Sequence, residues 1–257
     1  MTKTFVDRAC EGLITVSIVS HGHGHLLRAL LDDLAACPEV SSVILTHNIP
    51  EANVNYAKPG WLHVVNNPKP KGFGSNHNAA FQCVHTPYFA VLNPDVRLTG
   101  NPFPALVNCF KTNDASLCAP AVIDPTGALE DSTRQFPTIT NLVMKALGLQ
   151  DGRLQYTLRD PPLPVPWVAG MFVLMRSTDY SAMNGFDEGY FLYYEDVDLC
   201  ARLKLAGGKI ILCPGVQVVH DARRASRRNL RHMWWHAASM VRYFRKYLWR
   251  SFQQTTG

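Results

Sequence analysis

The sequence predicts an α/β protein in which a largely parallel sheet is covered by helices and followed by a basic helical tail. Short β-branched apolar runs alternate with helix-compatible segments in the first third of the chain, which is typical of parallel strands joined by helices. The chain has 257 residues, of which 47% are hydrophobic and 18% are charged. This composition suits one large α/β domain or two small ones.

The first strand is expected over residues 13–20 (LITVSIVS), a β-branched apolar run. The leucines that follow recur at spacings of three and four residues, which predicts a helix. Further strands are expected over residues 43–46, 62–65 and 88–92, and residues 75–84 are compatible with a helix. The leucines of the first helix are Leu26, Leu27, Leu30, Leu31 and Leu34.

The middle of the chain has a different character. Residues 117–123 predict a strand, and residues 124–127 (DPTG) have the composition of a tight turn. A loop-rich insertion containing several prolines is expected from there to Pro166.

Regular structure is expected to resume after the insertion. Strands are predicted over residues 168–175 and 209–213, with a helix over residues 196–206 between them. Asp196 stands where it would cap this helix, and the two glycines at 207–208 would end it.

Composition also excludes several classes of protein. The seven cysteines are scattered and form no Cys-x-x-Cys pair, so a reducing compartment is expected and a disulfide scaffold is not. No stretch has the roughly 18 uncharged apolar residues that a spanning helix needs, and the N-terminus lacks the layout of a secretory signal. A soluble, cytoplasmic protein is therefore expected.

The tail is strongly basic. Nine of the 25 Lys and Arg residues lie between residues 223 and 250, where no acid occurs, which leaves 16 bases against 20 acids in the body. We therefore expect a catalytic-sized domain over residues 1–222 and a basic amphipathic helical extension over residues 223–257. The apolar positions at helical spacing are Met233, Trp234, Ala237, Val241, Phe244 and Leu248.

Such a helix suits the surface of an anionic membrane, through residues 223–250. Packing on the body, or a homo-oligomer contact, is an equal alternative. Nucleic acid is not expected as a partner, because the body is acidic and offers no matching basic groove.

Asn93, Pro94 and Asp95 directly follow the apolar run that ends at residue 92. Ligands of open α/β sheets gather at the carboxyl ends of the strands. A single carboxylate there, beside phosphates, suits Mg²⁺ or Mn²⁺, which take few protein carboxylates. The alternative is a Pro-Asp turn in which the aspartate is a local cap.

Three acids, Glu195, Asp196 and Asp198, stand at the start of the helix expected over residues 196–206. The helix dipole lowers carboxylate pKa values, whereas acids packed this closely raise one another's. Such a cluster could hold a general base beside a substrate hydroxyl. Alternatively the acids only cap the helix, and this interpretation is favoured for Asp198.

Two further segments could bind ligands. Residues 71–74 (KGFG) offer two glycines against which a sugar or phosphate could pack, although a plain tight turn before a helix is equally compatible. His21, His23 and His25 would share one face of an extended segment and would suit zinc, nickel or copper. That cluster would make the protein a metal-dependent hydrolase.

The block from residue 185 to residue 207 (GFDE, then FLYYEDVDLCxRLxxxG) closely resembles family 2 glycosyltransferases, above all their rhamnosyltransferase-type branch. Further blocks support the resemblance and come in the order of that family. They are Lys71-Gly72-Phe73-Gly74-x-x-x-Asn78, Asn93-Pro94-Asp95-Val96, Arg134-Gln135-Phe136-Pro137, Trp167-Val168-Ala169-Gly170, and His220 near the end of a strand.

The resemblance implies a GT-A fold, a single Rossmann-like domain that binds a nucleotide diphosphate sugar and a divalent cation, Mg²⁺ or Mn²⁺. By position, Asp95 and His220 are implied to bind the metal, Asp196 is implied to be the catalytic base, and Glu195 stands beside it. The residues implied to bind the donor are Ser20, His21, His47, Asn48, Lys71, Gly72, Phe73, Gly74, Asn78, Asn93, Asp95 and Gly170, and those implied to bind the acceptor are Trp167, Tyr194 and Arg134.

The implied activity is inverting transfer of a hexose or deoxyhexose, such as rhamnose, from a dTDP- or UDP-sugar. The implied acceptor is a saccharide, lipid-linked in surface polysaccharide synthesis, which would bring the enzyme to the cytoplasmic face of a membrane. The sequence departs from the family pattern at His21, at residues 45–48 (LTHN) and at Asn93, where the family has a tyrosine, an aspartate-rich motif and an acid. These departures keep open a domain that binds nucleotide sugar without catalysis.

Overall fold

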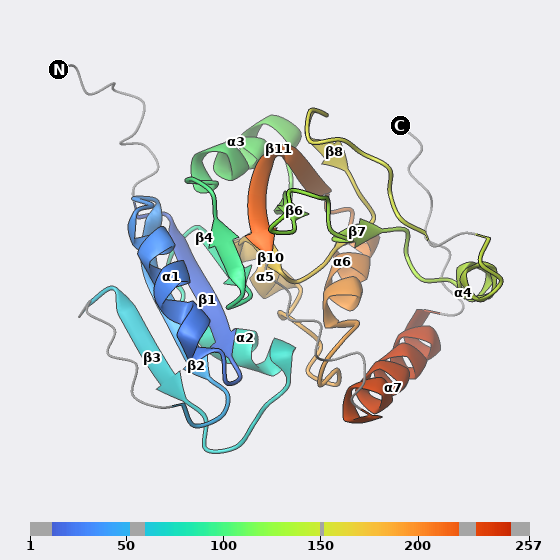
Figure 1. Cartoon of the computed structure of the whole chain (residues 1–257), viewed down its shortest axis with the longest axis horizontal. Coiled ribbons are helices and arrows are strands. Elements are labelled where there is room, and N and C mark those ends of the chain that lie inside the picture. The colour runs from blue at the N-terminus through green and yellow to red at the C-terminus, as the bar shows by residue number, and fades with distance from the viewer. Residues whose placement is uncertain (1–11, 52–59, 150–151, 221–229, 248–257) are drawn as a thin grey trace.

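Figure 1 shows the chain as a computed structural model, which describes residues 12–51, 60–149, 152–220 and 230–247. Within these residues, nine strands form one sheet in the order β3-β2-β1-β4-β10-β6-β11-β5, with β8 beside β11. β1 is parallel to β2 and β4, whereas β10 runs antiparallel between β4 and β6. The predicted α/β architecture with a mostly parallel mixed sheet is confirmed.

The elements have the following bounds. The strands are β1 (Ile14–Ser20), β2 (Val40–His47), β3 (Leu62–Asn66), β4 (Tyr88–Leu92), β5 (Val96–Leu98), β6 (Leu117–Ile123), β7 (Thr133–Arg134), β8 (Leu163–Pro164), β9 (Trp167–Val168), β10 (Phe172–Arg176) and β11 (Ile210–His220). The helices are α1 (Gly24–Ala35), α2 (Phe73–Phe81), α3 (Phe103–Asn113), α4 (Ile139–Ala146), α5 (Ser177–Ala182), α6 (Glu195–Leu205) and α7 (Leu230–Tyr247).

Apolar side chains fill both faces of the sheet. α1 and α3 cover one face, and α5, α6 and α7 contribute to the core on the other. β4 shows how alternation along a strand serves both layers. Its Ala90 and Leu92 belong to the first cluster, and its Phe89 and Val91 belong to the second. The near-continuous apolar runs of the sequence are thus explained by burial on two sides.

Two elements of the second half differ from expectation. The stretch expected to be loop contains the short helix α4. The strand expected over residues 168–175 is divided, because β9 pairs with β7 in a separate two-stranded sheet whereas β10 pairs with β4 and β6. Residues 169–171 bridge the two sheets, and this break brings the backbone of Gly170 to the candidate site.

The start of α6 corrects a prediction about Asp196. Tyr194 is the N-cap residue, with a left-handed φ of 65°, and Asp196 lies inside the first turn. The Asp196 carboxylate is not the cap, because it accepts hydrogen bonds from Val197 N (2.7 Å) and from Gly170 N (3.0 Å) on the neighbouring segment.

Candidate active site

The residues predicted to bind the donor come from neighbouring strands of the sheet. Ser20 and His47 end β1 and β2 in register, and Asn48 N donates to Ser20 O at 2.8 Å. β4 is parallel to β1, so Asn93 and Asp95 leave the sheet at the same carboxyl edge. The topology therefore brings together three segments that lie far apart in the sequence, where an open α/β sheet binds its ligand.

Asn48 connects this edge to the glycine loop. Its Oδ1 accepts from Lys71 N (2.8 Å) and its Nδ2 donates to Lys71 O (2.9 Å), which fixes the backbone of the loop at both polar groups. The same Nδ2 lies 3.3 Å from His21 Nδ1. Burial, followed by the neighbouring His23, lowers the pKa of His21. A neutral imidazole at this position suits stacking on a nucleobase.

The glycines of the loop are required by close packing within the protein. A Cβ on Gly72 would lie 2.9 Å from Phe191 O, and one on Gly74 would lie 2.6 Å from Phe186 Cβ. Asn78 reaches the same turn, because its Oδ1 accepts from Phe186 N and its Nδ2 donates to Phe186 O, both at 2.9 Å. Gly74 and Asn78 thus pack against the turn at Phe186, between α5 and α6. Lys71, Gly72 and Asn78 line an open pocket of about 540 Å³.

Asp95 and His220 lie side by side, as a shared metal site requires. His220 Nε2 is 3.3 Å from Asp95 Oδ1, and His220 Nδ1 is 2.7 Å from Glu130 Oε2. Burial opposes protonation of His220, but the two carboxylates together raise its pKa. Asp95 Oδ1 is buried, and it faces His220 Nε2. A buried carboxylate oxygen beside an imidazole fits a divalent cation such as Mg²⁺ or Mn²⁺.

Asp196 is half-buried and is held in place by hydrogen bonds from the backbone. Its two hydrogen bonds come from backbone N–H groups of Gly170 and Val197, which orient both carboxylate oxygens. Burial raises the pKa of Asp196, and these hydrogen bonds oppose the rise. Burial, and then the charge of Asp196, raises the pKa of Glu195 well above its ordinary value. Of the two acids, Asp196 is therefore the one that more readily carries the negative charge that a general base needs.

The three residues predicted to bind the acceptor share one pocket with these acids. Arg134, Trp167 and Tyr194 line a cavity of about 390 Å³ together with Glu195 and Asp196. Arg134 is oriented by Asp131, whose carboxylate accepts from its Nε at 2.7 Å. Trp167 Nε1 donates to Gln135 O at 3.1 Å. A planar aromatic and a guanidinium beside a carboxylate are suited to holding a polar ring such as a sugar.

The backbone before α6 is strained at two consecutive positions. Tyr193 and Tyr194 have φ values of 70° and 65°, in the left-handed region. Asp114 and Asn184, the other non-glycine residues with positive φ among those described, are of types that tolerate this region. A bulky residue in that region is held at a cost of about 1–3 kcal/mol.

The histidine cluster predicted from the sequence is not assembled. The segment is not extended, because α1 begins at Gly24 and His25 lies within it. His23 Nδ1 instead accepts from His21 N at 3.1 Å. A zinc site needs at least three His, Cys, Asp or Glu side chains with their ligand atoms close together. Among the described residues, the group whose ligand atoms all lie within 4.8 Å of one another consists of three cysteines and contains no histidine. The metal-dependent hydrolase hypothesis therefore loses its structural basis.

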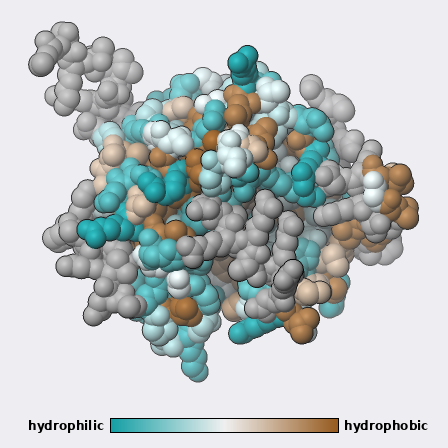
Figure 2. Space-filling view, viewed as in Figure 1, coloured by the Kyte–Doolittle hydropathy of each residue, from teal (hydrophilic) through white to brown (hydrophobic). Residues whose placement is uncertain are grey.

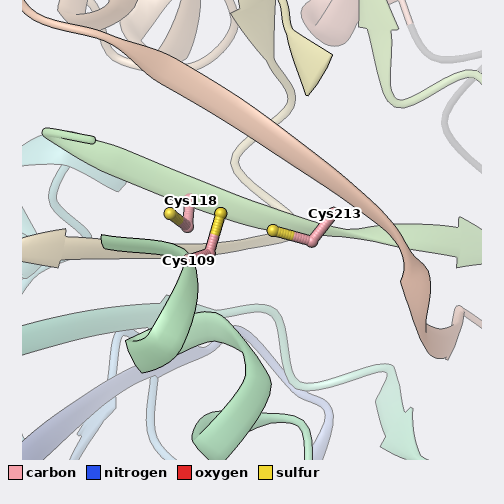
Figure 3. A group of neighbouring side chains, drawn as sticks. All are labelled: Cys109, Cys118 and Cys213. Atoms are coloured by element: carbon pink, nitrogen blue, oxygen red, sulfur yellow. The ribbon is translucent and has the colours of Figure 1, made fainter. Parts of the chain in front are cut away.

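The three cysteines pack in the core (Figure 3). Cys109, Cys118 and Cys213 come from α3, β6 and β11 and are at most 3% exposed, within the first apolar cluster. β6 runs parallel to β4, and Cys118 is near its amino end, away from the edge where Asp95 emerges. Thiols in such surroundings behave as small apolar side chains.

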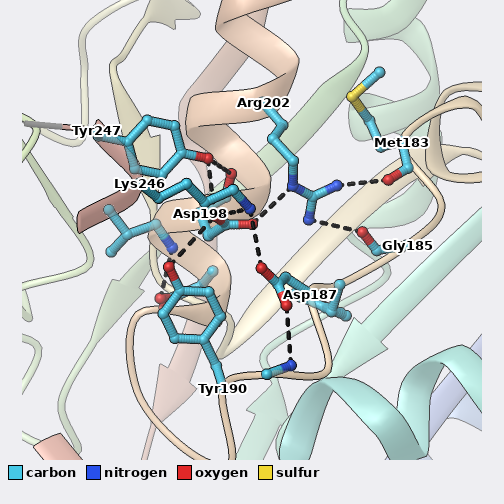
Figure 4. Close-up of polar contacts among 12 residues, drawn as sticks. Met183, Gly185, Asp187, Tyr190, Asp198, Arg202, Lys246 and Tyr247 are labelled. Atoms are coloured by element: carbon cyan, nitrogen blue, oxygen red, sulfur yellow. Dashed lines mark hydrogen bonds and ion pairs between the residues drawn. The ribbon is translucent and has the colours of Figure 1, made fainter. Parts of the chain in front are cut away.

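Asp198 is neither a cap nor part of the pocket. It is fully buried, and its carboxylate accepts from Arg202 Nε (2.7 Å), Tyr247 OH (2.8 Å) and Lys246 Nζ (2.7 Å), as Figure 4 shows. Asp187 also binds Lys246, at 3.0 Å. This network joins α6 to the end of α7.

The two sides of α7 differ in exposure. Ser239, Tyr243 and Tyr247 are buried against the body. Met233, Trp234 and Val241, which belong to the apolar face predicted from the sequence, point outward and are 59%, 69% and 55% exposed; Leu248 lies outside the described residues. Exposed apolar side chains also occur at α4 and just after it, where Figure 2 shows an apolar patch: Ile139, Leu147 and Leu149. None of the described helices is both long and apolar enough to cross a bilayer.

Sequence reasoning missed several residues of the site. Glu130, which binds His220, follows a turn in irregular chain and has no local signal. His236 and Met240 of α7 line the cavity that contains Asp196, and the helical spacing of the tail was the one sequence signal for the side of the helix on which they lie.

Similarity to known proteins extends over nearly the whole chain. The family model described as "Glycosyltransferase like family 2" matches residues 12–256. "Rhamnosyltransferase WbbL" of Escherichia coli (strain K12) is 28% identical over 252 residues, which cover 90% of this chain and 92% of that protein. The "N-acetylglucosaminyl-diphospho-decaprenol L-rhamnosyltransferase" of Mycobacterium tuberculosis (strain CDC 1551 / Oshkosh) is 33% identical over 148 residues, 54% of this chain and 48% of that protein.

Solved glycosyltransferase structures share the fold. GalNAc-T7, crystallised with UDP, GalNAc and Mn²⁺, has a TM-score of 0.61 at 16% identity, over 82% of this chain and 44% of that one. The mannosyltransferase PcManGT from Pyrobaculum calidifontis, in complex with GDP-Man and Mn²⁺, has a TM-score of 0.57 at 14% identity, over 90% and 65%. Together with the family match, these similarities show that the chain has a GT-A fold and belongs to the family 2 glycosyltransferases, of the rhamnosyltransferase-like kind.

Proposed function

We propose that this glycosyltransferase is inverting and metal-dependent, and that it moves a hexose or deoxyhexose from a dTDP- or UDP-sugar to a lipid-linked saccharide in surface polysaccharide synthesis. The observation that carries the proposal is the position of Asp196, which lies in one pocket with Arg134, Trp167 and Tyr194. Rhamnose is the first candidate sugar, because two relatives are named as rhamnosyltransferases. The name of the mycobacterial relative suggests an acceptor with N-acetylglucosamine on a prenyl diphosphate.

Asp196 acts as the general base in this proposal. Its carboxylate takes the proton from an acceptor hydroxyl while that oxygen forms a bond to the anomeric carbon of the donor. The bond from the anomeric carbon to the diphosphate oxygen breaks on the opposite face, and the diphosphate leaves with the electron pair. Glu195, with its strongly raised pKa, stays protonated and leaves the charge on Asp196.

Asp95 and His220 would hold the divalent cation, with Glu130 fixing the His220 ring through Nδ1. When bound, Mg²⁺ or Mn²⁺ supplies positive charge against the charge that develops on the leaving diphosphate. The nucleobase is expected beside His21 and Asn48, at the ends of β1 and β2.

The lipid-linked acceptor requires the enzyme at a membrane surface, which we propose is the cytoplasmic face. The outward side chains Met233, Trp234 and Val241 of α7 would enter the interface, and the basic residues of 223–250 would attract anionic headgroups. A homo-oligomer contact through the same face is the competing outcome, and a concentration-dependent mass in solution would reveal it.

The experiment is a thermal-shift panel of UDP, dTDP, GDP and their sugars with Mn²⁺, Mg²⁺ or EDTA, followed by transfer to N-acetylglucosaminyl-diphospho-decaprenol. A metal-dependent rise in Tm with dTDP or UDP compounds, and transfer from the same donor, are expected. Asp95→Asn should remove the metal-dependent rise, while Asp32→Asn, an exposed acid on α1, should keep it. Binding without hydrolysis or transfer would favour the non-catalytic alternative, and no binding by the folded protein would contradict the proposal.

A further inference from the structure

α7 contacts the segment that leads into the candidate base. Ser239 Oγ donates to Leu192 O at 2.8 Å, and Tyr193 OH lies 2.9 Å from His232 Nδ1. The His236 ring lies against both tyrosines of the strained pair, with centroid distances of 5.3 Å to Tyr193 and 5.4 Å to Tyr194. Three consecutive residues of the segment are therefore held by side chains from one helix more than 35 residues later in the chain.

These contacts are made to the segment whose backbone is strained. Tyr193 and Tyr194 are both left-handed, and Tyr194 is the N-cap residue of α6. Because Asp196 is the second residue of that helix, a relaxation of either tyrosine would rotate the first turn. The hydrogen bond between Asp196 and Gly170 N would then change.

The far end of α7 is fixed to the body. Lys246 and Tyr247 bind the buried Asp198 (Figure 4), and Arg242 binds Asp187 at 2.8 Å. Asp198 belongs to α6, the helix that also carries Asp196. The C-terminal end of α7 is thus attached to α6, and the first half of α7 contacts the strained segment before α6. These two attachments leave α7 little freedom to move relative to the base.

The helix also borders the space in which the acceptor would bind. His236 and Met240 line the cavity of about 390 Å³ that contains Asp196, opposite residues from β7, β9 and α4. We infer that α7 is a working part of the transfer site: His236 contacts the acceptor saccharide, and the Ser239–Leu192 and His232–Tyr193 contacts position the base. This inference rests on the proposed function, because it assigns the acceptor to that pocket.

Four variants test it in the full chain. His236→Ala removes the pocket-lining ring, and Tyr193→Phe and Ser239→Ala each remove one hydroxyl. Ser177→Ala is the matched control, because Ser177 Oγ also donates to a backbone carbonyl, Thr86 O, at 2.7 Å, but at the other end of β10. The measurements are Tm, donor binding, donor hydrolysis by water, and acceptor KM and kcat, with a short-chain prenyl-diphospho-N-acetylglucosamine that needs no membrane.

His236→Ala should raise the acceptor KM about fivefold, the effect of one lost polar contact, and leave donor binding and hydrolysis unchanged. Tyr193→Phe and Ser239→Ala should lower kcat for transfer about tenfold through misplacement of the base, with unchanged donor binding, whereas Ser177→Ala should match the wild type. The inference would be overturned if the acceptor KM and the kcat for transfer were equal in all variants. It would also be overturned if donor binding weakened in parallel with a fall in Tm. A wild-type protein that neither hydrolyses nor transfers would instead contradict the proposed function.

Discussion

The proposed donor side and the proposed acceptor side of the site are built in different ways. On the donor side, Ser20, His47 and Asn93 come from the ends of three adjacent parallel strands, and the register of the sheet brings them together. On the acceptor side, Arg134 and Trp167 come from a small separate sheet, and His236 comes from the C-terminal helix. Strand register positions the first group, whereas tertiary contacts between distant segments position the second.

The difference predicts how each side responds to mutation. A change on the donor side removes a ligand contact and leaves the sheet intact, because the strands are buried on both faces. A change at the contacts that link α6 and α7 on the acceptor side alters tertiary packing, so it should affect stability as well as activity. The predictions below test this contrast, from the largest expected effect to the smallest.

Asp196→Asn should lower kcat for transfer about 10³-fold, because a positioned general base contributes about 10²- to 10⁴-fold. The amide keeps the shape of the side chain, so donor binding measured by thermal shift should remain. Glu195→Gln is the matched comparison and should retain far more activity, since Glu195 has the more strongly raised pKa of the pair. A reversed ranking of the two variants would move the role of base to Glu195.

Asp198→Asn should lower the free energy of unfolding by about 3 kcal/mol, because it breaks a buried ion pair and removes the anion that Arg202 and Lys246 share. Urea denaturation measures this effect. Asp114→Asn is the control, because its carboxylate pairs with Arg176 but is 77% exposed, and exposed pairs contribute little. A small effect at Asp198 would mean that the other contacts of α7 are sufficient to hold it against the body.

The pH dependence of transfer should reflect the raised pKa of the acid pair. The base must be ionised, so kcat should fall as the pH falls, with an apparent pKa above the ordinary aspartate value of 3.8. Because folding raises the pKa of Asp196, the protonated carboxyl also contributes to the stability of the protein. This contribution is fully present below pH 3.8 and is lost as the pH rises through the pKa of the folded state. A kcat that stays constant down to pH values below 3.8 would contradict this assignment.

Trp234→Ala should weaken sedimentation with anionic vesicles by a factor of about ten, because it removes one interfacial aromatic side chain. Donor hydrolysis in solution should be unchanged, since Trp234 is 69% exposed and outside both pockets. Neutral vesicles provide the comparison for the electrostatic contribution. Unaltered binding to anionic vesicles would argue against a membrane contact through α7.

The sheet edge that carries the proposed donor residues was largely predictable from the sequence because its signals are local. Each strand is a short apolar run, and Asp95 follows one of them directly, so its place at the sheet edge could be inferred. The pocket composed of Arg134, Trp167, Tyr194 and the acids followed from family resemblance. Composition or spacing could not have indicated it.

The rest could not be predicted, for physical reasons. α4 is two turns long and lies among prolines, so its periodicity is too short to separate it from loop. Glu130 and His236 act through neighbours 90 and about 40 residues away in sequence, and no local pattern encodes such contacts. Asp198 looked like a cap because its partners Lys246 and Tyr247 belong to a different element.

The break between β9 and β10 has a consequence for the dimensions of the site. Met171 O accepts from Asn93 N at 2.8 Å, and the adjacent Gly170 N donates to Asp196 Oδ2 at 3.0 Å. The turn that carries Asp95 and the side chain of Asp196 are therefore both attached to a single dipeptide, whose length is set by covalent geometry. If Asp95 and Asp196 have the roles proposed above, this short connection limits the distance between the leaving group and the attacking hydroxyl, so a bulkier donor sugar would have to find room elsewhere.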